Sequence, residues 1–407
     1  QRTFVVKVMG RNCGYLALMG ALATGAAWVL IPESPPDVEN WQDVLVERLK
    51  AGRKAGRRDS IVILAEGARD KNGKYIGSSD VQRLLEESLG EEVRVTMLGH
   101  VQRGGRPSAY DRILATMMGN EAVNTILAAT PQDEPVVIGI RNNRMTRLPL
   151  MGSVRRTQAV AEAVEAKDYE RAMSLRSSSF KDAFLTFKTM VRALPHPTDP
   201  SKKRFRIAVM HAGAPSPGMN TAARAAIRLG MDMGHVMLGV HNGFEGLVDG
   251  EVETMDWMSV SGWASRGGSV LGTTRRVPKG RDLYSIARVI EDHKIDALLV
   301  IGGWNAYESV FTLLKERSNF PSFNIPMICS SVHRLRAISS IFSRSPKFIA
   351  PVGHVLTHAG SMPSLILSMH MVHLAIPWVF ASHRGISHGQ ASRICLNSFS
   401  FTFTFGL

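Results

Sequence analysis

The sequence has 407 residues, enough for two domains with full cores, and its 44% hydrophobic and 21% charged residues are ordinary for a globular protein. Three scattered cysteines form no CxxC pair, which favours a reducing, cytoplasmic compartment and argues against a zinc site. The net charge of +14 would suit nucleic acid or anionic metabolites, but six of these charges come from residues 330–407, which contain no Asp or Glu. The rest of the excess is moderate and suits an enzyme for phosphorylated metabolites.

Apolar runs alternate with helical patterns through the first 150 residues. Such alternation predicts an α/β fold of three layers, in which mostly parallel sheets carry helices on both faces. Ligands of these sheets bind beyond the carboxyl ends of the strands. The predicted strands are 4–9, 28–32, 60–65 and 92–99, and the predicted helices are 14–24, 38–51 and 79–89.

A second α/β unit follows after a linker. Residues 151–190 are predicted to be helical, and residues 191–204, with three prolines and a Lys-Lys-Arg cluster, have the composition of a linker. New strands are predicted at 206–210 and 297–301. We therefore divide the chain into 1–190, 191–204, 205–329 and 330–407.

The last segment, 330–407, differs from the rest in composition. It holds seven of the 13 histidines, at no spacing typical of a metal site, and its apolar residues follow neither a 3.6 period nor strict alternation. We expect no compact domain there, and we expect limited proteolysis to cut first beyond Cys329. The stretch 362–381 is long enough to raise the question of a membrane span, but its prolines and histidines argue against one.

Short polar motifs follow the predicted strands. Met9-Gly10-Arg11 and Glu66-Gly67 could place an arginine for a phosphate and a carboxylate for sugar hydroxyls, although each alone is more often a turn or a helix cap. The tract 98–108 carries His100, Gln102 and two arginines among glycines, as a phosphate monoester pocket requires. A basic turn or a nucleic-acid loop is the alternative, but the tract lacks the interleaved aromatic residues of single-strand binders.

Two glycine-rich stretches mark the second unit. Residues 212–220 link a predicted strand to a helix, which is the order of a phosphate cradle, although no Gly-Lys-Ser/Thr follows as in a Walker A loop. Residues 266–269 and 272–276 combine small residues with arginines. For 212–220 a phosphate cradle and a structural turn fit about equally well, and for 266–276 anion binding and a solvated basic turn do.

Taken together and in order, these tracts resemble the phosphofructokinase family of the eukaryotic, doubled type. The resemblance covers about four fifths of the chain. Residues 1–190 are similar to the later part of a catalytic half, and residues 205–328 to the opening of a regulatory half, through Gly218-Met219-Asn220, 243–247 and 302–308. It implies two tandem, incomplete phosphofructokinase-like domains.

The resemblance implies an ATP-dependent 6-phosphofructokinase, a glycolytic transferase that uses magnesium. The counterparts of Arg2 and Arg94 reach a neighbouring subunit's site in the family, which implies a homo- or hetero-oligomer of tetramer size or larger. Arg275 would hold the effector fructose 2,6-bisphosphate, and neither nucleic acid nor membrane is an implied partner. The implied fructose 6-phosphate contacts are Arg2, Met9, Gly10, Arg11, Glu66, Arg94, His100, Val101, Gln102 and Arg103.

The sequence also departs from the family pattern. It opens at Gln1 and runs directly into a strand, so we expect a chain cut from a longer protein, and the family's ATP loop, Gly-Asp-Gly metal segment and Thr-Ile-Asp base segment are not found. After Cys329 the expected Pro-Ala-Thr-Ile-Ser-Asn-Asn loop is replaced by Ser330-Ser331-Val332-His333. We therefore expect no catalytic residue in this chain and no measurable kinase activity from it alone. The alternative function is a non-catalytic truncated subunit that binds sugar phosphates or partner subunits.

Overall fold

The computed structural model describes residues 2–36, 40–54, 56, 59–141 and 144–330. The predictions for the segment after Ser330, including the stretch 362–381, lie outside the described residues.

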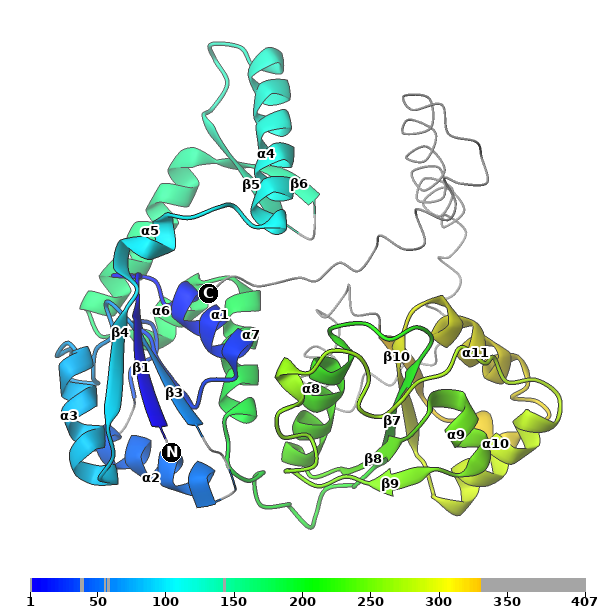
Figure 1. Ribbon diagram of the computed structural model, residues 1–407. Coiled ribbons are helices and arrows are strands. Elements are labelled where there is room, and N and C mark those ends of the chain that lie inside the picture. The colour runs from blue at the N-terminus through cyan, green and yellow to red at the C-terminus, as the bar shows by residue number, and fades with distance from the viewer. Residues whose placement is uncertain (1, 37–39, 55, 57–58, 142–143, 331–407) are drawn as a thin grey trace, which may run out of the picture. The chain divides into compact units, whose positions relative to one another are not determined.

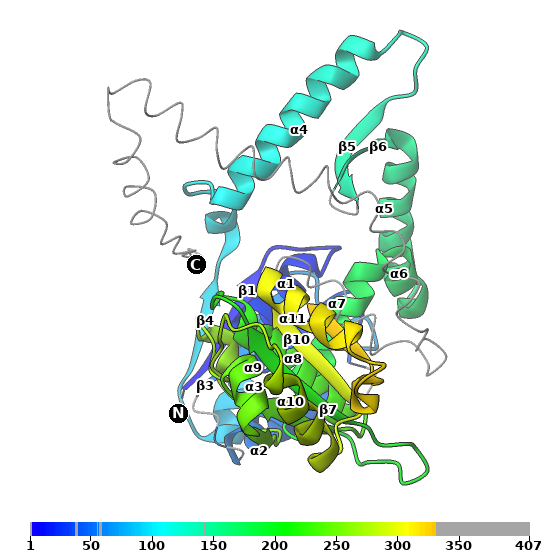
Figure 2. The same cartoon turned by 90° about the vertical axis from the view of Figure 1, so that its right-hand side faces the viewer.

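The first sheet is parallel throughout and has the order β2-β3-β1-β4. Its β-branched residues, such as Val5 and Val62, suit a sheet that is buried on both faces. The four predicted strands are confirmed within a few residues, and β1, β3 and β4 are labelled in Figures 1 and 2. The strands are β1 (Arg2–Val8), β2 (Trp28–Leu30), β3 (Asp59–Ala65) and β4 (Val93–Met97).

Helices cover both faces of this sheet, which gives the predicted three layers. On one face, α2 (Trp41–Lys54) and α3 (Ser78–Leu89) contribute residues such as Leu45 to a core with Val62. On the other, α1 (Tyr15–Thr24) and α7 (Ser178–Met190) pack onto Ile63. Helix α1 ends at Gly25, whose φ of 68° provides the left-handed cap that glycine adopts most easily.

The second sheet has the order β11-β10-β7-β8-β9, with only the β8–β9 pair antiparallel. Alternate residues of β7 enter different cores: Ala208 and Met210 face α9, α10 and α11, whereas Val209 faces α8. This unit is therefore three-layered as well. Its elements are β7 (Arg206–Ala212), α8 (Met219–Asp232), β8 (Val236–Val240), α9 (Gly243–Asp249), β9 (Val252–Thr254), η2 (Trp263–Ser265), α10 (Arg281–Asp292), β10 (Ala297–Gly302), α11 (Trp304–Lys315), η3 (Pro321–Phe323) and β11 (Met327–Ser330).

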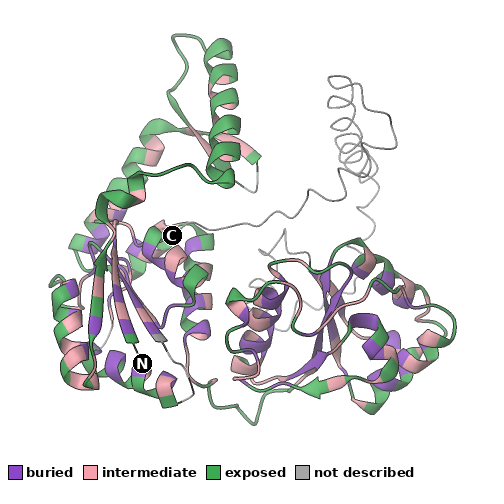
Figure 3. Ribbon diagram, in the orientation of Figure 1, coloured by how far each residue is buried: buried purple, intermediate pink, exposed green. Residues whose placement is uncertain are grey.

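The region between the sheets departs from the expected parallel alternation. Residues 136–149 form an antiparallel hairpin outside the first sheet, because two extended runs lie close together in sequence and pair with each other. Its preceding helix α4 has no buried residue, and Figure 3 shows α4 and the hairpin as largely exposed. The elements of this region are α4 (Ala109–Ala128), β5 (Val136–Arg141), β6 (Arg144–Pro149), α5 (Leu150–Glu165) and α6 (Tyr169–Leu175).

The predicted linker, 191–204, contains neither helix nor strand. Just before it, the carbonyl of Met190 at the end of α7 accepts a hydrogen bond from the buried Arg228 of α8 at 2.8 Å. In the described part of the chain, no helix combines the length and the apolar character needed to cross a membrane.

Candidate functional site

The three strongest motifs of the first unit follow three neighbouring strands. Met9–Arg11 follows β1, Glu66 follows β3, and the 3₁₀ helix η1 (Gly99–Arg103) follows β4. Backbone hydrogen bonds join them, from Glu66 N to Val8 O at 2.9 Å and from Leu98 N to Lys7 O at 3.0 Å. The structure therefore brings the three motifs together at the carboxyl edge of the sheet, where ligands of parallel sheets bind.

The Met9–Arg11 backbone is fixed by both of its neighbours. The side-chain oxygen of Gln102 accepts the Met9 N–H at 2.7 Å, and the Gly67 N–H donates to Gly10 O at 3.2 Å. Gly67 lies so close to the loop that an added Cβ would be 1.6 Å from the carbonyl oxygen of Arg11. Glycine is therefore required at position 67 for this close approach.

The charged side chains of this edge remain open to solvent. Arg11, Glu66, His100 and Arg103 are exposed, and among the described residues none of them forms a hydrogen bond or ion pair through its side chain. Val101, which is 74% exposed, lies among them. Cationic groups and a carboxylate without competing partners can bind a phosphate and hydroxyl groups together.

Arg2 and Arg94 are not part of this cluster. Arg2 opens β1, at the end of the strand opposite Met9, and Arg94 pairs in register with Phe4 near that same end. The Arg94 guanidinium lies 3.2 Å from the Glu92 carboxylate and is half exposed. The structure therefore separates these two arginines from the other eight predicted contacts.

Arg275 lies at the corresponding edge of the second sheet. Its side chain is exposed, and its carbonyl oxygen is 3.5 Å from the Asn305 amide nitrogen. The adjacent Thr274 carbonyl accepts the Gly213 N–H at 2.8 Å. The next arginine differs, because Arg276 is paired with Asp282 at 2.7 Å.

Buried polar side chains connect the two glycine-rich stretches of this unit. Asn220 donates to the carbonyls of Arg266 and Gly267 at 2.9 and 3.2 Å, and its oxygen accepts the Val270 N–H at 2.7 Å. The sequence indicated a possible phosphate cradle at 212–220 and a basic loop at 266–276 as separate features. The structure connects them through the Asn220 side-chain amide.

A buried histidine supports the same loops. The His211 ring nitrogens lie 2.6 Å from Ser269 Oγ and 3.1 Å from Met219 O. Burial lowers the pKa of His211 to about 4, so the ring is neutral at physiological pH. Sequence patterns alone gave no reason to single out this residue.

Two further residues at the first site were missed by the sequence analysis. Glu33 is fully buried, and its carboxylate accepts the Gly14 N–H and pairs with Arg176. The local sequence gave one weak hint, since Glu33 is a lone acid between Pro32 and Ser34-Pro35 at the end of an apolar strand. An unpaired carboxylate is rarely buried, so Glu33 would need a partner from elsewhere in the chain. Arg176 lies 143 residues further on, and no local pattern connects the two.

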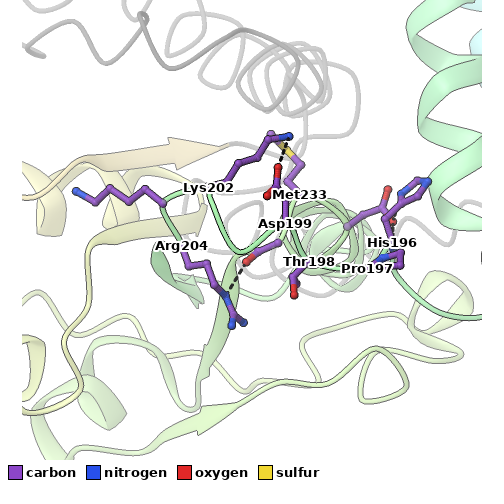
Figure 4. Close-up of a pocket in the computed structure, with 10 residues that line it drawn as sticks. His196, Pro197, Thr198, Asp199, Lys202, Arg204 and Met233 are labelled. Carbon is purple, nitrogen blue, oxygen red and sulfur yellow. Dashed lines mark hydrogen bonds and ion pairs between the residues drawn. The ribbon is translucent and has the colours of Figure 1, made fainter.

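Two cavities among the described residues lie elsewhere. One, of about 230 Å³, is lined by the linker and the end of α8, including His196, Lys202 and Arg204 (Figure 4). It shares no residue with the predicted sites, and Asp199 and Asp232 offset its positive charge. Within the described ranges, no group of three or more His, Cys, Asp or Glu side chains could hold a metal ion.

Comparison with known proteins decides the family. The family model described as Phosphofructokinase matches residues 1–126 and 206–331 separately. The chain belongs to the phosphofructokinase family. Two successive matches agree with two tandem phosphofructokinase-like segments, one built around each sheet.

Relatives within the phosphofructokinase family include mammalian proteins named ATP-dependent 6-phosphofructokinase. The chain is 47% identical over 327 residues to the human ATP-dependent 6-phosphofructokinase, liver type, and 44% identical over 329 residues to the platelet type of Rattus norvegicus. These alignments cover 80% and 81% of the chain but 41% of each relative, so the chain spans about two fifths of their length.

Solved phosphofructokinase structures share the fold. The chain superposes on phosphofructokinase from Saccharomyces cerevisiae with a TM-score of 0.76 at 42% identity, covering 81% of this chain and 43% of that one. Phosphofructokinase from Pichia pastoris in the T-state gives a TM-score of 0.77 at 40% identity, over 81% of this chain and 37% of that one. The predicted α/β fold with tandem domains is thereby confirmed.

Proposed function

We propose that this chain supplies the fructose 6-phosphate clamp of an ATP-dependent 6-phosphofructokinase, which makes fructose 1,6-bisphosphate in glycolysis. The observation that carries the proposal is the convergence of Met9–Arg11, Glu66 and His100–Arg103 at one sheet edge, in a chain of this family. The names of its relatives support the activity.

The roles of the side chains follow from their chemistry. Arg11, His100 and Arg103 offer cationic or hydrogen-bonding groups to the 6-phosphate, and planar guanidinium groups suit phosphate oxygens. Glu66 accepts hydrogen bonds from the sugar hydroxyls. Fixing the sugar at both ends would hold its 1-hydroxyl in one direction, which favours transfer through positioning.

The other substrate and the partners are part of the proposal. ATP with Mg²⁺ provides the transferred phosphoryl group. We assign neither to a residue here, because the family's ATP loop and Gly-Asp-Gly metal segment are not found in this sequence. Arg2 and Arg94, being exposed and distant from the clamp, would serve a neighbouring subunit's site in a cytoplasmic oligomer. Arg275, exposed beside the second sheet's loops, would bind fructose 2,6-bisphosphate.

Calorimetric titration tests the clamp directly. The purified chain should bind fructose 6-phosphate, and it should bind fructose at least tenfold more weakly because the phosphate contacts are lost. Arg103→Ala should weaken binding of the phosphate ester and leave fructose unaffected. Equal affinities for the two sugars would contradict the proposal.

A further inference from the structure

We infer that Glu33 and Arg176 are positioning residues, which hold the Met9–Gly14 loop in the shape that presents Arg11 to the substrate. The inference rests on the proposed function of this loop. Neither side chain is placed to bind the substrate itself, since Glu33 is fully buried and the Arg176 guanidinium donates to the backbone carbonyl of Asn12.

The Glu33 carboxylate is bound on both sides. Its two oxygens lie 3.0 and 2.9 Å from the Gly14 nitrogen, and Arg176 approaches one of them with Nε at 2.9 Å and Nη2 at 2.8 Å. A buried carboxylate is stable only with such partners, so each group depends on the others.

Arg176 extends the network to a second point of the loop. Its Nη2 donates to the Asn12 carbonyl at 2.5 Å, so one guanidinium bridges Glu33 and the backbone two residues before Gly14. Arg176 directly precedes Ser177, the residue that caps α7, and its backbone is held by that helix start. The Met9–Gly14 loop is therefore connected through Arg176 to the start of α7, which is distant in sequence.

The loop has no room for another shape around these contacts. An added Cβ on Gly14 would lie 2.4 Å from Ile31 Cβ and 2.7 Å from Glu33 Oε2. An added Cβ on Gly10, whose φ is 137°, would lie 2.3 Å from Cys13 O. The backbone is thus fixed at Asn12 and Gly14 by the Glu33–Arg176 pair, while the Arg11 side chain stays exposed.

A simpler role for Glu33 would be to stabilise only the start of α1. The variants Glu33→Gln and Arg176→Met separate the two roles. The glutamine of the first variant keeps an oxygen for the Gly14 N–H but loses the ion pair. The methionine of the second variant keeps the Glu33 carboxylate as acceptor of the Gly14 N–H but removes its cation and frees the Asn12 carbonyl. Arg176→Lys should restore part of the function, because a lysine can reach one of the two acceptors but not both.

The experiment combines hydrogen exchange of peptides covering residues 9–14 with calorimetric titration of fructose 6-phosphate. Both main variants should speed exchange in this loop and weaken binding about tenfold, as expected for a shifted site. Glu91→Gln is the matched control. It breaks the partly buried Glu91–Arg53 pair at the amino edge of the same sheet and should change neither readout.

Unchanged loop exchange and unchanged affinity in Glu33→Gln and Arg176→Met would overturn the inference. Weaker binding with normal exchange would also overturn it, because the residues would then act other than by holding the loop. A wild-type chain that binds no fructose 6-phosphate would defeat the proposed function instead, and loop exchange alone would decide whether the pair anchors the backbone.

Discussion

Among glycine-to-alanine substitutions at the first site, Gly67→Ala should be the most damaging. The added Cβ would lie 1.6 Å from the Arg11 carbonyl oxygen and 2.6 Å from its carbonyl carbon. A C···O contact needs about 3.3 Å, so the loop must retreat by about 1.7 Å. The backbone angles of Gly67 are not left-handed, and the effect is therefore steric rather than conformational.

The magnitude follows from what this retreat breaks. Overpacking of this kind costs about 1–3 kcal/mol, and the loss of the Gly67–Gly10 hydrogen bond adds about 1 kcal/mol. A displacement of more than 1 Å at a substrate loop lowers function by about 100-fold. We therefore expect a lower melting temperature and fructose 6-phosphate binding weakened by roughly this factor.

Gly104→Ala provides the matched control for thermal unfolding and calorimetric titration. Gly104 ends η1 in an extended conformation, and its added Cβ would meet nothing nearer than 3.9 Å. This variant should behave as the wild type does. If Gly67→Ala matched Gly104→Ala in both melting temperature and affinity, the close approach of the two loops would be refuted.

Three other changes have definite expected outcomes. Gln102→Leu removes the acceptor of the Met9 N–H and should cost about 1–3 kcal/mol in urea unfolding, whereas no loss would show that the bond is dispensable. The pKa of His211 is about 4 in the folded chain and 6.5 in the unfolded chain. The free energy of unfolding should therefore keep its full value above pH 6.5 and fall by about 3 kcal/mol towards pH 4. His211→Asn should make the free energy of unfolding less dependent on pH in this range, and an unchanged pH dependence would contradict burial of His211 as the cause. Arg228→Met removes the 2.8 Å donor of the Met190 carbonyl, which then keeps only the 3.5 Å contact with Arg224, and should lower the melting temperature; an unchanged value would show that the Arg228 bond is dispensable.

Much of the first site could be predicted because its parts follow apolar strands. The runs that end near Met9, Glu66 and Leu98 are each bounded by glycine, and parallel strands place their carboxyl ends at one edge. The order of the strands, and hence the contact between Gln102 and Met9, was not readable, because it depends on pairing between distant segments.

The features that were missed depend on contacts over long sequence separations. Glu33 and Arg176 meet only because α7 packs on the same sheet face as α1. The hairpin of residues 136–149 was missed for a different reason. The Asn142-Asn143 pair between two extended runs is a sequence signal for a turn, and a simple strand–helix alternation does not include it.

A crystal structure of the chain with fructose 6-phosphate would show where the sugar phosphate binds. We predict density for the phosphate within hydrogen-bond distance of Arg11, His100 or Arg103, and sugar hydroxyls against Glu66. Density for the sugar phosphate only at the Gly213–Arg275 edge, or only in the linker cavity, would contradict it.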